Sequence, residues 1–126
     1  MRDFHKLGNV TIADGAAVSD AIAVPEGYSV TMVGVPTSWS AADMGFQFAQ
    51  AGDATFADLF TGVGTTVSRF RMTGIPTASA SLVLVPGVLD IGLGLSVKVT
   101  SINTADNTDQ NQTGAITLDI WIARVN

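Results

Sequence analysis

Apolar and polar side chains alternate with a period of two in several short segments of this chain. In the clearest segment, Ile116–Ala123, isoleucine or leucine occupies every second position and Thr, Asp or Trp stands between. The same period occurs in Met44–Ala49 and in Val97–Thr100. Successive side chains of a strand point to opposite faces, so this period predicts β-strands with one buried face.

Further segments rich in β-branched and apolar residues lie between turn residues such as those of Pro25–Gly27, while evidence for helices is thin. These segments are Asn9–Ile12, Ala17–Val24, Ser29–Val35, Thr55–Phe60, Arg69–Thr73 and Leu82–Val85. Gly62–Gly64 reads as a turn. About nine short strands at regular spacing predict an all-β protein, an antiparallel, jelly-roll-like β-sandwich with little or no helix.

The domain organisation follows from length and local composition. A chain of 126 residues is close to the commonest size of one domain. We expect a single sandwich over residues 9–126, preceded by a mobile N-terminal arm at residues 1–8. The stretch 103–114 has no large apolar side chain and joins two strong strands, so it is predicted to be a long surface loop.

Charge and composition exclude several classes of function. The net charge is −5 and the six Lys and Arg residues are scattered along the sequence, which argues against nucleic-acid binding. No apolar run is long enough for a transmembrane helix, and no apolar segment of a signal peptide follows the charged start, so we expect neither membrane insertion nor export by that route. Cysteine is absent and only 13 % of residues are charged. A surface this poor in charge suits a protein that works against another surface.

No group of residues predicts catalysis, a cofactor or a metal. His5 is the one histidine and lies in the predicted arm, where a general base would be poorly held. The paired carboxylates, Asp53 with Asp58 and Asp106 with Asp109, are expected to be turn residues, because no apolar neighbours would raise one pKa of either pair. A calcium site in the 103–114 loop is a weaker alternative, which would use oxygens of Asp106, Asn107, Asp109 and Asn111.

Six residues are candidates for a contact with another protein. Tryptophan is enriched in interfaces, but it also packs in cores and stacks on sugars, and all three readings stay open for the two tryptophans here. Two arginines alternate outward on one strand and are expected to pair with Asp residues across a strand or with an acidic partner. The arm supplies two apolar anchors. The candidates are Phe4, Leu7, Trp39, Arg69, Arg71 and Trp121.

The chain resembles small head-associated virion proteins of tailed bacteriophages and gene transfer agents. The more specific parts of the likeness are a Trp–Ser–Ala…Phe–Gln segment and a Phe–x–Asp–Leu hairpin in which the preceding Gly and Asp stand in the opposite order. The likeness extends over roughly residues 16–124. The segments that carry it are Ala16–Ile22, Tyr28–Pro36, Ser38–Gln47, Gly52–Phe60, Asn111–Gln112 and the closing strand that ends at Ala123–Arg124.

The resemblance implies a β-sandwich that decorates a phage head and carries no catalytic residues. The expected partners are the major capsid protein and further copies of the chain, as a homotrimer or another homo-oligomer. The protein would be made in the host cytoplasm and reside on the capsid surface of the virion. Two alternatives remain: a low-copy vertex, head-spike or tail-associated protein, and a carbohydrate-binding jelly-roll module that presents Trp39 or Trp121 to a glycan.

Overall fold

The computed structural model describes residues 3–50, 52–63, 66–85 and 94–125. Within these ranges the chain is all-β, so the predicted antiparallel β-sandwich is confirmed. No helix in this part of the chain is long and apolar enough to span a membrane. The strands are β1 (Phe4–Ile12), β2 (Ile22–Ala23), β3 (Tyr28–Val35), β4 (Asp43–Gln50), β5 (Ala57–Asp58), β6 (Phe60–Val63), β7 (Thr66–Arg69), β8 (Ser81–Leu84), β9 (Leu95–Ile102) and β10 (Ile116–Arg124).

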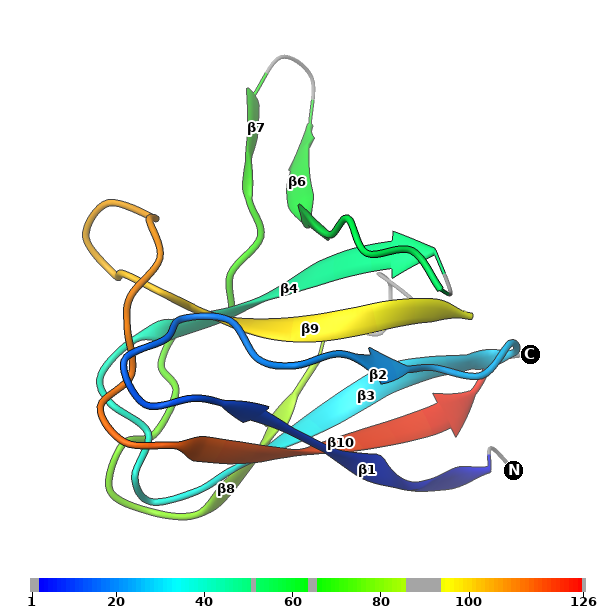
Figure 1. Cartoon of the computed structure of the whole chain (residues 1–126), viewed down its shortest axis with the longest axis horizontal. Helices are drawn as coiled ribbons and strands as arrows, with labels where there is room; N and C mark the ends of the chain where they lie inside the picture. Colours follow the sequence, from blue (N-terminus) through cyan, green and yellow to red (C-terminus); the bar gives the residue numbers. More distant parts are fainter. Residues whose placement is uncertain (1–2, 51, 64–65, 86–93, 126) are drawn as a thin grey trace.

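Eight of these strands form two four-stranded sheets (Figure 1). Sheet A has the order β1-β10-β3-β8, and sheet B has the order β2-β9-β4-β5. The antiparallel pairing is nested: β1 pairs with β10, β2 with β9, β3 with β8 and β4 with β5. The chain therefore runs as one long ribbon of paired strands that passes back and forth between the two sheets. Strands β6 and β7 form a separate two-stranded hairpin.

The core fills the space between the sheets, and period-two alternation supplies it. In β10 the four side chains of Ile116, Leu118, Ile120 and Ile122 are fully buried. Sheet B contributes the buried side chains of Val97, Val99 and Phe46 to the same core, and strand β3 of sheet A adds further valines. Burial of this much aliphatic surface, at roughly 25 cal/mol per Å², is the main term that stabilises the sandwich.

Residues 4–8 do not form the mobile arm that the sequence predicts. They are the first half of β1 and pair with β10, from Phe4 opposite Ala123 to Gly8 opposite Ile120. A bulge at Leu7 turns its side chain against the core. The adjacent polar residues His5 and Lys6 interrupt the period of two, so the sequence pattern did not indicate this strand, and an edge strand with one exposed face needs few apolar side chains. Residues 1–2 lie outside the described residues.

Three predicted boundaries change around the edges of sheet B. The segment 17–24 makes isolated bridges at Val18 and Ser19 and only the short β2. The segment 55–60 is divided between β5 and β6, and the segment 69–73 between the end of β7 and a bridge from Met72 to Met44. Gly62 belongs to strand β6 and not to a turn, whereas Gly64 lies outside the described residues.

The stretch 103–114 is a surface loop between β9 and β10, as predicted. Gln112 fixes it to the sandwich although only 1 % of this residue is exposed. Its amide oxygen accepts a hydrogen bond from the Ser40 nitrogen at 2.7 Å, and its amide nitrogen donates to Ser101 Oγ at 2.9 Å. A buried amide with both ends satisfied specifies one loop position.

Candidate interaction surface

The outer face of sheet A carries a row of apolar side chains that crosses all four strands. Trp121 on β10 lies opposite Met32 on β3, and Met32 lies opposite Leu84 on β8. At the other end Phe4 of β1 stacks on Trp121, with ring centroids 5.4 Å apart. We call Phe4, Trp121, Met32 and Leu84 the outer row. Since neighbouring strands are about 4.8 Å apart, the row spans about 14 Å.

Most of the exposed large apolar residues in the described chain lie on the outer face of sheet A. Four such residues are exposed in the described part of the chain, and three lie on this face: Phe4 at 46 %, Leu82 at 56 % and Leu84 at 75 %. Single exposed leucines are common, but a contiguous apolar patch indicates an interaction surface. The position of these apolar residues side by side on one face, and not the apolar composition of the chain, identifies the outer face of sheet A as a candidate interaction surface.

Trp121 lies at the centre of the row and is half-buried. One side of its indole is covered by Phe4. Its Nε1 is buried and has no hydrogen-bond partner among the described residues. A half-buried tryptophan that is held by a stacked aromatic ring is a contact residue of the kind that is enriched in interfaces.

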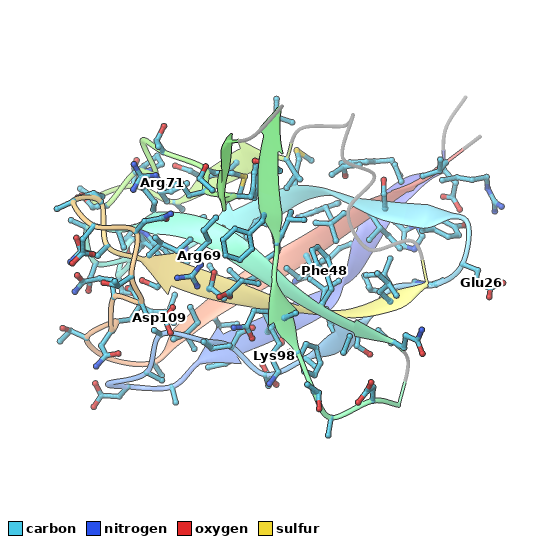
Figure 2. All side chains as sticks on the ribbon, turned by 90° about the horizontal axis from the view of Figure 1, so that it is seen from above. Glu26, Phe48, Arg69, Arg71, Lys98 and Asp109 are labelled. Atoms are coloured by element: carbon cyan, nitrogen blue, oxygen red, sulfur yellow. The ribbon has the colours of Figure 1, made fainter. Side chains whose placement is uncertain are left out.

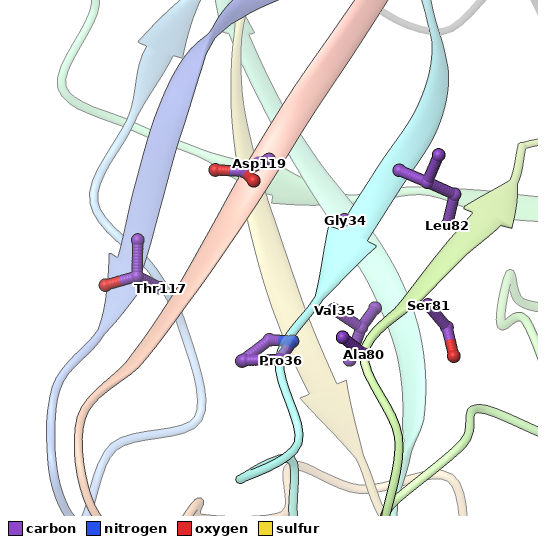
Figure 3. A pocket seen from close by; sticks show the side chains of 8 residues that line it. All are labelled: Gly34, Val35, Pro36, Ala80, Ser81, Leu82, Thr117 and Asp119. Carbon is purple, nitrogen blue, oxygen red and sulfur yellow. The ribbon is translucent and has the colours of Figure 1, made fainter.

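A groove of about 510 Å³ lies beside the row (Figure 3). Gly34 forms its floor, Leu82 stands on one side, and Thr117 and Asp119 stand on the other. A Cβ atom at Gly34 would lie 3.0 Å from Asp119 Cβ, so glycine is what allows β10 side chains to lie across β3 here. Asp119 is paired with Lys6 Nζ at 3.0 Å. The groove thus combines an apolar wall with a neutralised charge pair.

A polar network fixes the end of β1 beside Phe4. The Tyr28 hydroxyl donates to Asp3 Oδ2 at 2.7 Å, and Arg124 donates to the Tyr28 hydroxyl at 2.8 Å. The hydrogen bond from Tyr28 lowers the pKa of Asp3, and the same bond raises the pKa of Tyr28. His5 packs edge-on against Tyr28, with its Nδ1 3.4 Å from Asp3. These contacts join the ends of β1, β3 and β10 and so hold Phe4 over Trp121.

The two arginines do not form an open cationic patch. Arg69, with a side chain only 8 % exposed, pairs with Asp58 at 3.2 Å and with Asp109 at 2.8 Å. Arg71 pairs with the buried Asp43 at 3.4 Å. Figure 2 shows both arginines beside the hairpin, on the side of sheet B. Pairing with aspartates of the same chain, one of the two predicted alternatives, is therefore observed.

The acidic residues of the 103–114 loop are engaged within the chain. Asp106 accepts hydrogen bonds from the nitrogen and hydroxyl of Thr108, which lower its pKa, and Asp109 pairs with Arg69. Among the described residues, no three His, Asp or Glu side chains form a group that could hold a metal ion. The loop positions its aspartates as structural acceptors, and Asp109 ties it to the hairpin.

The structure brings together two of the six candidate contact residues, Phe4 and Trp121. Trp39 is a core residue at 2 % exposure, and its Nε1 donates to the Ala42 carbonyl at 3.2 Å. Leu7 packs on the core. For Trp39 the structure shows the core position, one of the three interpretations left open above, whereas Leu7 is only partly buried and its predicted contact stays a prediction.

Sequence reasoning missed Met32, Leu82 and Leu84. A signal was present in β8 and the residue after it, where Leu82 and Leu84 alternate with Val83 and Val85. Both phases of the alternation are apolar. Such a strand is either covered on both faces or exposes one apolar face, and only the sheet order shows which applies.

Comparisons of the chain with protein-family models, with curated proteins and with solved structures find no match. The resemblance to head-associated virion proteins therefore stays a prediction.

Proposed function

We propose that this protein is a bacteriophage virion structural protein, a capsid decoration protein that binds the head shell and stabilises it without catalysis. The observation that carries the proposal is the outer row, a contiguous apolar strip on an otherwise polar, charge-poor protein. A strip fixed on four paired strands is a preorganised contact surface, so little conformational entropy is lost when it binds.

The nested pairing of strands supports the proposal at the level of the fold. The pairs β1 with β10, β2 with β9, β3 with β8 and β4 with β5 are those that a jelly-roll winding would contain, and they support the expected jelly roll. Jelly rolls are frequent in viral capsid proteins and in lectins. Fold alone does not define a function, and the outer row is the feature that favours the first class.

The proposed partner is the major capsid protein, and the proposed location is the capsid surface of a virion assembled in the host cytoplasm. A single contact about 14 Å long is modest. Repetition over a lattice multiplies such contacts through effective concentration, which is how a small decoration protein stabilises a large shell. The assignment includes no cofactor and no nucleic acid.

The carbohydrate-binding alternative now rests on the groove at Gly34, since Trp39 is buried and one face of Trp121 is covered by Phe4. The groove is lined by Thr117 and Asp119, which offer polar groups to a sugar. The low-copy vertex, spike or tail alternative shares the outer row and differs only in the number of sites on the particle.

Binding to shells tests the proposal. Shells assembled from the major capsid protein of the source particle are sedimented with wild-type protein, with Phe4→Lys, with Met32→Lys and with the control Thr55→Lys, which adds the same charge at an exposed turn. We expect about tenfold or greater weakening for the first two, because a lysine must then be desolvated within the contact, and no change for the control.

Equal binding by all four proteins would contradict a contact through the outer row. Counting the chain by mass spectrometry in purified particles decides between the positions. A ratio near one copy per capsid subunit, as a trimer at every three-fold position gives, or of order one-third, as one chain per three-fold position gives, places it on the lattice. A handful of copies selects the vertex, spike or tail alternative. Absence from particles overturns the proposal, and a glycan array would then test the groove.

A further inference from the structure

The hairpin β6–β7 projects from the sandwich on the side of sheet B, away from sheet A (Figure 1). Its base is firmly held. The Leu59 nitrogen donates to the Phe46 carbonyl at 3.0 Å, and the Phe70 nitrogen donates to the Leu59 carbonyl at 2.8 Å. Phe70 also stacks on Phe46, and Arg69 pairs with two aspartates. The hairpin is therefore a stiffly mounted projection.

Beyond this base the described strands of the hairpin pair only with each other. An antiparallel pair leaves half of its backbone donors and acceptors directed away from the partner strand. A two-stranded sheet in water is marginally stable by itself, and a third strand adds both hydrogen bonds and cover. Phe60 at the start of β6 is 54 % exposed, so this element also presents apolar surface.

Strand β8 is a sheet edge with matching properties. It has four residues, as do β6 and β7, and among the described strands it pairs only with β3. Its outward side chains, Leu82 and Leu84, are the two most exposed large apolar residues in the described chain. No charged residue occurs from Met72 to Val85.

Soluble proteins usually protect such an edge with lysine, proline, bulges or cover. The opposite edge of sheet A follows this rule, since β1 carries Lys6 and a bulge at Leu7. Among the described strands β8 pairs only with β3, so its outer edge is a candidate for a contact with another chain.

Charge favours a second copy of this chain as the occupant. The net charge of −5 makes copies repel one another over most of their surface. Residues 59–63 and 66–68 of the hairpin, like the segment Met72–Val85, carry no charge. Contact between these two segments brings copies together where the repulsion is smallest.

We propose that the β6–β7 hairpin of one copy pairs with the β8 edge of a second copy and extends its sheet A. The contact buries Phe60 and the two leucines of β8 and satisfies backbone groups on both elements. Because hairpin and edge are different surfaces, the contact is heterologous, so it closes into a ring when the rotation between copies allows it. It goes beyond attachment to a shell, and it forms in solution without one.

Sedimentation velocity over a range of concentrations tests the contact. Wild type is expected to form a closed oligomer, whereas Leu84→Lys weakens self-association by about tenfold or more, because the added charge is desolvated at the edge. Leu84 is 75 % exposed, so the variant keeps its fold, which circular dichroism verifies. The control Ala21→Lys adds the same charge at an exposed position away from both elements and retains wild-type association.

Cysteine cross-linking tests whether the hairpin of one copy contacts the β8 edge of another. The sequence contains no cysteine, so only the introduced cysteines can form disulfides. Ser68→Cys marks the hairpin, and separate proteins carry cysteine at Ser81, Leu82 or Leu84. Mild oxidation of the Ser68 variant mixed with an edge variant should give mixed dimers for at least one edge position, since a disulfide requires Cα atoms about 4.4–6.8 Å apart.

The proposal is overturned if wild type stays monomeric at all concentrations, or if the Ser68→Cys protein cross-links only to itself, because hairpins would then meet hairpins. Both readouts are taken without shells. A decoration protein that fails them still binds shells through Phe4 and Met32, so failure of this contact is distinguishable from failure of the proposed function.

Discussion

Single residues hold the two faces of this sandwich in different ways. On sheet A, Tyr28 and Asp3 fix the strand end that carries Phe4 over Trp121. On sheet B, Gly45 leaves room for the chain that returns from the hairpin. A Cβ atom there would lie 2.9 Å from the Phe70 carbonyl oxygen and 2.6 Å from Ile102 Cδ1. Tyr28 acts through its hydrogen bond to Asp3, and Gly45 acts through the close contact of its backbone with Phe70. A single substitution tests each of these contacts.

Replacing Tyr28 by Phe should raise the pKa of Asp3 toward its ordinary value of 3.8, because the hydroxyl is the main cause that lowers it. A lowered folded-state pKa means that ionised Asp3 stabilises the β1 end above the unfolded-state pKa, and that this contribution is lost as the pH falls through the folded-state pKa. NMR titration of the Asp3 carboxyl carbon measures the change. Asp106, whose pKa is lowered by Thr108, is the internal control and should titrate as in wild type. An unchanged Asp3 pKa would contradict the Tyr28 contact.

Replacing Gly45 by Ala should reduce the free energy of unfolding by about 1–3 kcal/mol, the usual cost of overpacking, because a backbone carbonyl must move. Gly8→Ala is the matched control. A Cβ atom at Gly8 would meet only the flexible end of the Ile22 side chain, Cδ1 at 3.2 Å, so we expect about 1 kcal/mol or less. Urea unfolding curves compare the two variants, and equal losses would count against the close approach at Gly45.

Among the elements, the hairpin depends most on side-chain chemistry. Among the described strands, β6 and β7 pair only with each other and not with sheet A or sheet B. Side chains at the base, Phe70 by stacking and Arg69 by its ion pairs, therefore help to set the orientation of the hairpin. Asp109 brings the 103–114 loop into the same cluster. The projecting hairpin is thereby joined to a loop that Gln112 already holds against the sandwich.

Replacing Arg69 by Met should loosen the hairpin selectively. Methionine keeps an apolar stem of similar length but leaves Asp58 and Asp109 without their cation, and we expect a loss of about 1–3 kcal/mol because both carboxylates retain some solvent. Hydrogen exchange should accelerate in β6 and β7 and remain slow in β10. Lys6→Met, which breaks the exposed pair with Asp119, is the control at about 0–1 kcal/mol. Uniform acceleration in all strands would show that Arg69 acts on the whole fold and not on the hairpin.

At the scale of the whole molecule, the sandwich presents contact features on two sides, because the outer row and the groove share Leu84 and Leu82 with the β8 edge. The outer row and groove lie on sheet A, the hairpin projects from the side of sheet B, and β8 forms an uncharged sheet edge. A protein with contact surfaces on different sides can join a shell and its own neighbours at once. This arrangement is what connects the proposed decoration function with the proposed contact between copies.

Deleting residues 1–8 tests whether the N-terminal segment contributes to the stability of the sandwich. The sequence predicts an arm that can be removed, whereas the structure makes residues 4–8 half of an edge strand. The deletion removes the packing of Leu7 and exposes the β10 edge, so the free energy of unfolding should fall by on the order of 2 kcal/mol. Full-length Phe4→Ala keeps the strand and should lose clearly less. A deletion variant with the wild-type urea midpoint would contradict the strand contribution and support a removable arm.

The sequence determined the class of fold and most of the core. Strict alternation in Ile116–Ala123 fixed which β10 side chains point inward, because a period of two has only two phases and one of them is aliphatic. Turn residues separated most strands correctly for the same local reason. The long loop at 103–114 was also readable, since it lacks the apolar side chains that any strand of this sandwich buries.

Tertiary structure alone decided which apolar residues remain on the surface. Trp39 and Trp121 are equally prominent in the sequence, yet the first is buried and the second lies in the outer row. The outer row joins residues from β1, β3, β8 and β10, and its existence depends on the sheet order and register. Those are set by long-range pairing of strands, which no local pattern encodes, so the candidate site became visible only when the strands were placed side by side.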